Sequence, residues 1–416
     1  MGDANRHFTC IIATLVGLAS CTGRDSTGPA AAPGPASQLL VEGGNGQSAF
    51  GGQPLAQAVR FKVADRNGTG VAGATVVFDV VAGEGTLTGT SPMTSDAAGI
   101  VIAPTWTVGR IAIPQQLRAT TGILQTTAAA TIRTQYHAEV RFFGSVVDTA
   151  VAAAFIRAAA RINAEVVGAL VATRLVNADL TPCGITGVAP LSETINSLVI
   201  YVSVVPPHGL EGLVARSGPC YVRQATGLTV VGAILIDAAA LPIIEAQGHL
   251  GDVIFHEMHH VLGFGTLWSS VSPPLNINAG TSSTAYVGVR GVQGCVSVGG
   301  AANCASNIPL ENIGGPGTVD VHWRRSEFET ELMVGFVAPA GVWMPLSAMT
   351  IGALTDLGYV TNASVTEPYT VPSSAVAALF DAIRAAQNVP EPAFAENVLA
   401  PRFSVAPNGD IRPIRR

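Results

Sequence analysis

The run His256-Glu257-Met258-His259-His260 is the feature that most restricts how this chain can fold. It follows the pattern His-Glu-x-x-His and is flanked by apolar residues, Val253–Phe255 and Val261-Leu262. On a helix, positions 256 and 260 differ by about 40°, so both imidazoles leave one face and can share one cation. The apolar flanks indicate a buried helix, in which polar groups need a metal or hydrogen bonds as compensation. The motif therefore predicts a buried helix that holds a metal ion.

The other two polar residues of the motif are expected to have different roles. Glu257 is rotated by about 100° from His256, which places its carboxylate beside the metal, where it can take a proton from bound water. His259 lies about 60° to the other side, so we expect it around the site or at the surface and not on the ion. The alternative is a solvated helix face with several histidines, and the apolar flanks argue against it.

A catalytic zinc ion usually takes three protein ligands and one water. His322 is the one histidine that follows His260, and this makes it the leading third ligand. His249 lies about two turns before His256, too far away to reach the same ion. A carboxylate is the competing possibility. The candidates are Glu311, Glu327 and Glu331.

Length and composition limit the number of domains and the classes of partner that this chain can have. The chain has 416 residues, which suggests two or three domains. Hydrophobic residues make up 48% and charged residues 12%, so large cores can form and wholesale disorder is excluded. The net charge is −6, and no block of Lys or Arg is present. Nucleic acid is therefore not an expected partner.

The N-terminus is expected to direct export. Residues 1–20 contain an apolar stretch, Phe8–Gly17, that is too short to span a bilayer and is typical of a signal peptide. The run Leu18–Cys21 resembles the bacterial lipobox, which implies a lipid on Cys21, with residues 21–37 as a polar tether. We expect a protein lipid-anchored to the bacterial envelope, at the periplasmic or extracellular face of the outer membrane. An ordinary signal peptide is the alternative.

Residues 38–135 have the short alternating runs of β-strands, such as Val59–Val63. Turn signals at Asp65–Gly68 and Ser95–Gly99 suit a small β-sandwich. With the run Val71–Val76 between those turns, the segment resembles the immunoglobulin-like domains of bacterial invasin and intimin. The resemblance implies an all-β spacer or an adhesion module with a surface partner. A plain stalk is the alternative.

Residues 138–360 mix helical and strand-like patterns, which predicts an α+β domain. Val147–Leu175 has apolar residues at helical spacing, and Ser197–Val205 and Leu228–Ile236 are strand-like. We expect the edge of Leu228–Ile236 to pair with an extended substrate.

The rest of the chain is less regular. Ser269–Gly317 is rich in Gly, Ser, Pro and Asn and predicts a functional or disulfide-tied insertion. A final helix is expected at Ser347–Leu357. Residues 361–416 form an expected C-terminal extension with one helix, Ser374–Ala386.

Four cysteines remain after Cys10 and Cys21 are assigned to the signal segment and the lipid. Export favours disulfides, and four cysteines allow three pairings. The sequential pairing closes the shortest loops. A site of four thiolates on zinc is the rival, but no Cys-x-x-Cys pair exists. The four are Cys183, Cys220, Cys295 and Cys304.

Residues 139–360 resemble the leishmanolysin family of metzincin peptidases. The resemblance rests on His256–Phe264, a long insertion, His322-Trp323 and Glu331-Leu332-Met333. Other metzincins have the third histidine where this chain has Thr266, whereas the leishmanolysin group has it beyond an insertion. The resemblance implies a turn at Gly263, His322 as the third ligand, and Met333 in a turn beneath the metal. Met344 and Met349 are alternatives for that methionine.

These features together predict a zinc metalloendopeptidase with one catalytic ion and protein or peptide substrates. Zinc would activate water, and Glu257 would serve as the base. Two other classes compete with this interpretation. One is a surface adhesin with an inactive peptidase-like domain. The other is a structural zinc domain, which would need four protein ligands and leave no open position.

Overall fold

The computed structural model describes residues 32–414, except for 51, 84, 110–113, 134–135, 211–212 and 388–395. The expected signal segment and Cys21 lie outside the described residues. Within the described part of the chain, no helix is long and apolar enough to cross a membrane. Export and lipid anchoring stay predictions.

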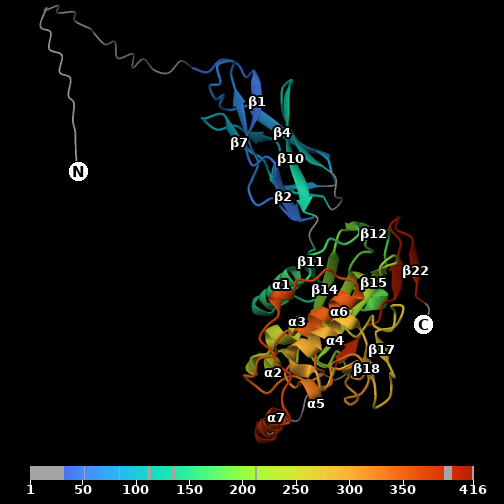
Figure 1. Cartoon of the computed structure of the whole chain (residues 1–416). Helices are drawn as coiled ribbons and strands as arrows, with labels where there is room; N and C mark the ends of the chain where they lie inside the picture. Colours follow the sequence, from blue (N-terminus) through green and yellow to red (C-terminus); the bar gives the residue numbers. More distant parts are fainter. Residues whose placement is uncertain are drawn as a thin grey trace, which may run out of the picture.

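The N-terminal part is a β-sandwich (Figure 1). One sheet has the order β1-β3-β7, and the other has the order β2-β10-β9-β4-β6. Phe61 and Phe78, one from each sheet, meet in the core with ring centroids 5.5 Å apart. The strands are β1 (Gln38–Gly43), β2 (Gln47–Phe50), β3 (Arg60–Ala64), β4 (Thr75–Ala82), β5 (Thr86–Thr88), β6 (Met93–Thr94), β7 (Ile100–Ile102), β8 (Thr105–Thr107), β9 (Gln115–Thr121) and β10 (Leu124–Arg133).

The second part is built on a mixed sheet with the order β11-β14-β16-β15-β21-β22, and β20 also pairs with β15. β11, β14 and β16 are parallel, whereas β15 runs antiparallel to β16. The strands are β11 (Ala138–Phe142), β14 (Leu198–Val205), β15 (Ala215–Arg223), β16 (Thr229–Asp237), β20 (Glu396–Val398), β21 (Phe403–Val405) and β22 (Ile411–Pro413). The strands β20–β22 belong to the residues that we expected to form a C-terminal extension.

The expected substrate edge at Leu228–Ile236 is wrong. This run forms β16, which lies between β14 and β15 and is buried along its whole length. A strand that is covered on both faces needs a continuous apolar sequence, which explains the pattern of this run. The backbone of β16 is paired on both sides, so it cannot bind another strand.

The helices in this part are α1 (Thr149–Glu165), α2 (Leu241–Ala246), α3 (Leu250–Leu262), α4 (Val289–Cys295), α5 (Arg325–Phe328), α6 (Ala348–Leu357) and α7 (Ser374–Gln387). Of these helices, α1 and α3 pack against the sheet, α4 packs against α6, and α7 lies apart from the sheet (Figure 1). Asp148 caps α1 by accepting a hydrogen bond from the Ala150 amide at 2.8 Å. We predicted that this helix continues to Leu175, but it ends at Glu165, and the next residue, Val166, is extended. Two β-branched residues, Val166 and Val167, followed by Gly168, disfavour a further turn.

The segment Ser269–Gly317 contains short regular elements and a disulfide. The elements are β17 (Asn276–Ile277), β18 (Ala285–Tyr286), α4, a π-helical turn (Val296–Gly300) and β19 (Ile308–Pro309). Cys295 pairs with Cys304, and Cys183 pairs with Cys220. The sequential pairing is therefore confirmed. The remaining short elements are β12 (Thr173–Arg174), β13 (Thr194–Ile195) and the 3₁₀ turns Thr181–Cys183 and Ala363–Val365.

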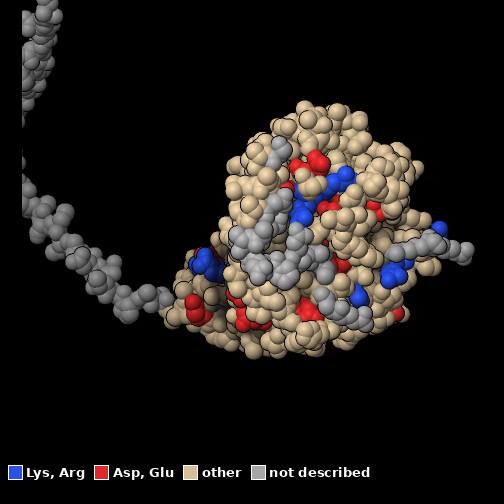
Figure 2. Space-filling view, turned by 90° about the horizontal axis from the view of Figure 1, so that it is seen from below, with Lys and Arg blue, Asp and Glu red and all other residues tan. Residues whose placement is uncertain are grey.

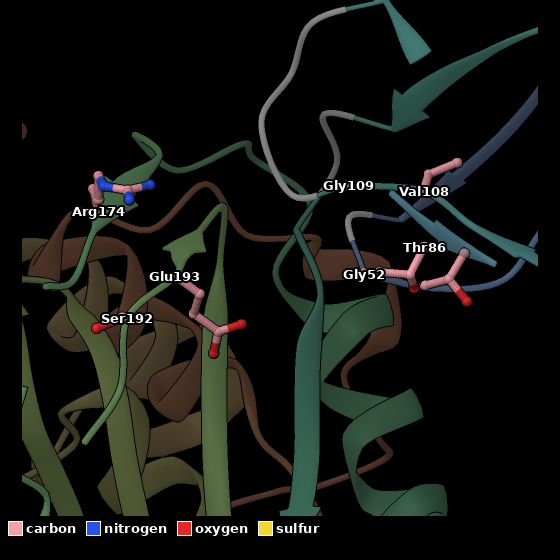
Figure 3. A pocket seen from close by; sticks show the side chains of 8 residues that line it. Gly52, Thr86, Val108, Gly109, Arg174, Ser192 and Glu193 are labelled. Atoms are coloured by element: carbon pink, nitrogen blue, oxygen red, sulfur yellow. The ribbon is translucent and has the colours of Figure 1, made fainter. Parts of the chain in front are cut away.

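The sandwich and the second part face each other at a pocket of about 410 Å³ (Figure 3). Thr86 and Gly52 line it from the sandwich, and Arg174 and Glu193 line it from β12 and the approach to β13. None of the motif histidines lines this pocket. On the face of the molecule seen in Figure 2, acidic and basic side chains lie intermixed in small groups among uncharged residues.

Candidate metal site

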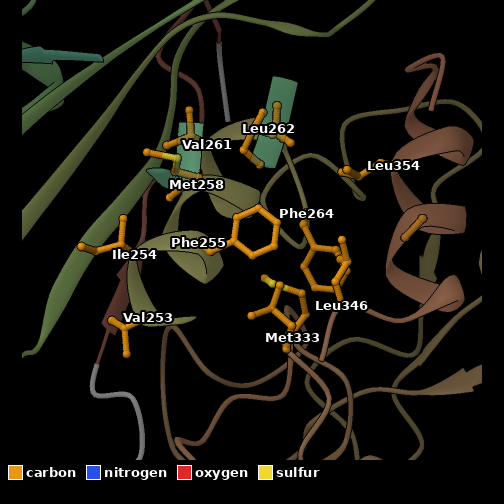
Figure 4. Packing of buried hydrophobic residues seen from close by; sticks show 14 of the residues in the cluster. Val253, Ile254, Phe255, Met258, Val261, Leu262, Phe264, Met333, Leu346 and Leu354 are labelled. Carbon is orange, nitrogen blue, oxygen red and sulfur yellow. The ribbon is translucent and has the colours of Figure 1, made fainter. Parts of the chain in front are cut away.

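The helix α3 presents the His-Glu-x-x-His motif inside the core. Every residue from Val253 to Leu262 is buried. Apolar side chains of α3 pack with Met333 and Leu346 in one cluster (Figure 4). Gly263 ends the helix with φ at +115°, and a Cβ here would collide with the Leu267 side chain. A left-handed residue in such close contact has to be glycine, which explains the expected turn at this position.

Three imidazoles meet at one point. Nε2 of His256 lies 3.0 Å from Nε2 of His260 and 3.1 Å from Nε2 of His322. The Nε2 atoms of His260 and His322 are 3.0 Å apart. All three side chains have zero exposure. His322 lies in the sequence between the insertion Ser269–Gly317 and α5. The structure thus brings together the three histidines that the sequence singled out.

Backbone carbonyls orient each of the three rings through the other ring nitrogen. Nδ1 of His256 faces the Leu332 carbonyl at 2.7 Å, Nδ1 of His260 faces the Phe264 carbonyl at 2.9 Å, and Nδ1 of His322 faces the Thr318 carbonyl at 3.0 Å. A carbonyl oxygen only accepts, so each Nδ1 carries the hydrogen. Each Nε2 atom then directs its lone pair toward the Nε2 atoms of the other two histidines.

Three converging lone pairs repel one another unless a cation lies between them. Burial lowers the pKa of both His256 and His260, so protonation of these rings is disfavoured. Nitrogen ligands that lie 2.0–2.1 Å from a tetrahedral zinc ion are separated by about 3.3 Å, close to the spacing of the Nε2 atoms here. The donor set therefore fits zinc, and the carbonyls on Nδ1 are the outer partners that metal-binding histidines require.

Glu257 lies beside this cluster with zero exposure. Neither of its carboxylate oxygens has a hydrogen-bond partner among the described residues. Burial raises the pKa of the Glu257 carboxyl well above its ordinary value, and the nearby carboxylate of Glu396 adds to this shift. A buried carboxyl with a raised pKa holds a proton more readily than an exposed one, which suits a group that accepts and returns a proton.

Glu396 is the residue of this site that we did not predict. One of its carboxylate oxygens lies 2.6 Å from Nε2 of His322 and 3.6 Å from Nε2 of His256, and the other lies 3.6 Å from Nε2 of His260. The side chain is 1% exposed. The four residues form a potential metal-binding group of three nitrogens and one carboxylate. The available sequence signal was weak, since Glu396 is a single acid in an apolar stretch.

The carboxylates considered as rival third ligands lie elsewhere. Glu311 accepts hydrogen bonds from the amides of Asn312 and Arg325, and Glu327 bonds to Asn303. Glu331 accepts hydrogen bonds from the Met333 amide at 2.6 Å and from the hydroxyls of Ser347 and Thr350, both at 2.6 Å. These bonds hold the turn that contains Leu332, whose carbonyl orients His256.

The remaining residues that the sequence singled out are buried. Met333 is fully buried and directly follows Leu332. His259 is also fully buried, so it is not a surface residue, and its Nε2 lies 3.0 Å from Oε1 of Glu165. His249 precedes α3 and its Nε2 lies 3.2 Å from the Pro339 carbonyl.

Residues 187–378 match the leishmanolysin peptidase family. A leishmanolysin homolog from Crithidia fasciculata is 30% identical over 181 residues, which is 41% of this chain. The aligned stretch is 25% of the length of that relative.

Two similar solved structures each cover about a quarter of this chain. Invasin, a bacterial integrin-binding protein, is 21% identical over 24% of this chain and 19% of its own, with a TM-score of 0.19. The D00-D0 domain of intimin is 16% identical over 23% of this chain and 44% of its own, with a TM-score of 0.18.

Proposed function

Because this chain carries a leishmanolysin-like peptidase domain, we propose that it is a zinc metalloendopeptidase. His256, His260 and His322 would hold the metal through Nε2, and Glu257 would move the proton. The observation that carries this proposal is the convergence of three buried Nε2 atoms. A backbone carbonyl faces Nδ1 of each ring, so the hydrogen lies on Nδ1 and the lone pair on Nε2. A buried cluster of this kind is stable only around a cation.

The chemistry divides between the metal and the protein. A bound zinc ion would lower the pKa of water and polarise the carbonyl of the scissile bond. Glu257 would accept a proton from the attacking water on a carboxylate oxygen and deliver it to the departing amine. Its buried position keeps that carboxylate away from bulk water, and its raised pKa suits both halves of the transfer.

Extended peptide would pair with β15 instead of the expected β16. β15 packs directly against α3, and its Ala215–Ser217 segment pairs with β20, whose Glu396 reaches the three histidines. Pairing along a strand edge recognises backbone more than side chains, which suits an endopeptidase of broad specificity.

The proposal is tested with Glu257→Gln in the full chain that also carries Glu396→Ala, so that the carboxylate of Glu396 cannot occupy the metal site. We expect the variant to retain one zinc ion and to lose cleavage of unfolded casein by at least about 100-fold, a typical effect of removing a general base. Glu245→Gln in the same background, which changes an exposed acid on the neighbouring helix α2, is the matched control and should cleave like Glu396→Ala alone. Equal cleavage by Glu257→Gln and its control would contradict the role of Glu257.

A structural zinc site is the second candidate, and Glu396 favours it because it supplies a fourth protein ligand. In that case the metal would be closed to substrate and Glu396 would be needed to keep it. Zinc content after replacement of Glu396 separates the two candidates.

Export and lipid anchoring are further proposals that rest on the sequence of the first residues. Lipid attached to Cys21 would place the chain on the bacterial envelope, and the β-sandwich would act as a spacer or as a module for a surface partner. Labelling with radioactive palmitate tests this, since Cys21→Ser should abolish incorporation and Cys10→Ser should leave it unchanged. Label that persists in Cys21→Ser would contradict the anchor.

A further inference from the structure

We propose that β20 is a built-in inhibitor of this metal site: it places the carboxylate of Glu396 on the open metal position and covers the edge of β15. This inference rests on the proposed peptidase function, because it explains how an intact site with four protein ligands could serve catalysis. The segment is displaced when the enzyme becomes active, and water and substrate take its place.

The segment lies where an extended peptide would bind. β20 pairs in parallel with β15, with Ala215 opposite Glu396 and Ser217 opposite Val398. The Leu399 amide donates a hydrogen bond to the Ser217 carbonyl at 2.6 Å. Backbone groups of β15 that could hold substrate are therefore engaged by the chain itself.

Two glycines in other parts of the domain make room for this segment. A Cβ on Gly218 of β15 would collide with the Leu399 carbonyl oxygen, and a Cβ on Gly317 would collide with the Glu396 carbonyl oxygen. Both glycines have positive φ, +147° and +95°. Their positions show a passage fitted to the backbone of residues 396–399, formed from two sides.

The carboxylate occupies the position that catalysis requires. Both oxygens of Glu396 lack a hydrogen-bond donor among the described residues, and they lie 2.6 to 3.6 Å from the three Nε2 atoms. Carboxylate oxygens and neutral imidazoles both offer lone pairs, so a shared cation would hold the group together. Three imidazoles and one carboxylate are the four protein ligands of a closed zinc site, so water would find no free position on the ion while Glu396 stays in place.

The contacts of β20 suit a segment that leaves while its neighbours stay. Asn397 is exposed and Val398 is only half-buried, so β20 contributes little apolar burial. The following strand β21 is anchored better, because Phe403 stacks on Tyr221 at 4.8 Å and Val405 is buried. Local opening is least costly where few apolar contacts are broken, so β20 can detach while β21 and β22 remain paired.

The first test compares the zinc-loaded full chain with Glu396→Ala and uses acetohydroxamate, a small zinc chelator, as the probe. We expect Glu396→Ala to keep one zinc ion per chain and to bind acetohydroxamate at least tenfold more tightly by calorimetry. The matched control is Asn397→Ala, which alters the adjacent exposed side chain and should bind the probe like the unchanged protein. Equal binding by all three chains, or loss of zinc from Glu396→Ala, would overturn the inhibitor.

A second variant tests the same idea without removing Glu396. Arg216 and Asn397 are paired in register, so Arg216→Cys with Asn397→Cys should form a disulfide that fixes β20 on β15. We expect the oxidised chain to bind acetohydroxamate at least tenfold more weakly than after mild reduction, with the unchanged protein given the same reductant as control. Binding that does not depend on this disulfide would overturn the proposal.

Casein cleavage keeps the two proposals apart. Tighter probe binding by Glu396→Ala without any cleavage would support the inhibitor and contradict the peptidase function. Cleavage by the unchanged chain at the rate of Glu396→Ala, with equal probe binding, would support the peptidase and contradict the inhibitor.

Discussion

Nε2 of His259 lies 3.0 Å from Oε1 of Glu165, and this contact joins the end of α1 to the metal helix α3. Both residues have zero exposure. Nδ1 of His259 faces the Phe255 carbonyl at 2.8 Å, so both ring nitrogens meet acceptors. Burial opposes a charged ring, but the carboxylate of Glu165 outweighs it and raises the pKa of His259. The buried pair fixes how α3 sits against its neighbour.

We predict that Glu165→Gln lowers the free energy of unfolding by about 3 kcal/mol, because removing one partner leaves the other buried without compensation. Chemical denaturation of the full chain measures this. The control is Asp410→Asn, which removes the acid of an exposed ion pair with Arg412 and should cost less than about 1 kcal/mol. Similar losses of unfolding free energy in both variants would show that the buried pair stabilises the fold no more than the exposed pair does.

Glu331 should affect metal binding although it is no ligand. Its carboxylate holds the turn whose Leu332 carbonyl orients His256. Glu331→Ala frees that turn, and we expect zinc affinity to fall by about 10- to 100-fold, as for other outer partners of metal ligands. Competition with a fluorescent zinc chelator measures the change. The exposed Glu245→Ala is the control, and an unchanged affinity in Glu331→Ala would contradict this role.

Asp237 should make stability depend on pH in the acid range. Burial raises the pKa of this carboxyl, but hydrogen bonds from the amides of Ala239, His208 and Leu210 outweigh it and lower the pKa below its ordinary value. A lowered folded-state pKa stabilises the fold above the unfolded pKa of about 4 and loses this effect as the pH falls through the folded value.

We therefore expect Asp237→Asn to unfold more easily than the unchanged protein at pH 7, by about 1 kcal/mol. The difference should shrink as the pH falls below about 4, where the native carboxyl also becomes neutral. Thermal unfolding at a series of pH values measures it. A difference that stays constant from pH 7 to pH 2 would contradict the assignment.

Local patterns were sufficient to predict the metal helix. The spacing of His256 and His260 and the apolar flanks predict α3 and its burial, because one helix face determines them. His322 was identified since no other histidine follows the motif. These predictions depend on residue type and on short spacing.

Other features depend on contacts between distant segments and could not be predicted in this way. Glu396 reaches the histidines only because β20 returns to the far edge of β15, and a single acid in an apolar stretch gives no sign of this. The continuous apolar sequence of β16 was itself a signal of a central strand, which we interpreted as an edge. α1 ends at Glu165 because two β-branched residues and a glycine follow it, but this signal is weaker in the sequence than the alanine-rich pattern before it.

The most direct test of the account is X-ray absorption at the zinc edge on the full chain. We predict one zinc ion per chain with three imidazole nitrogens at about 2.0 Å and one oxygen at about 2.0 to 2.2 Å. Glu396→Ala should keep the three imidazoles and exchange its carboxylate for water. A chain without zinc, or one whose zinc has sulfur neighbours at about 2.3 Å, would contradict the central claim.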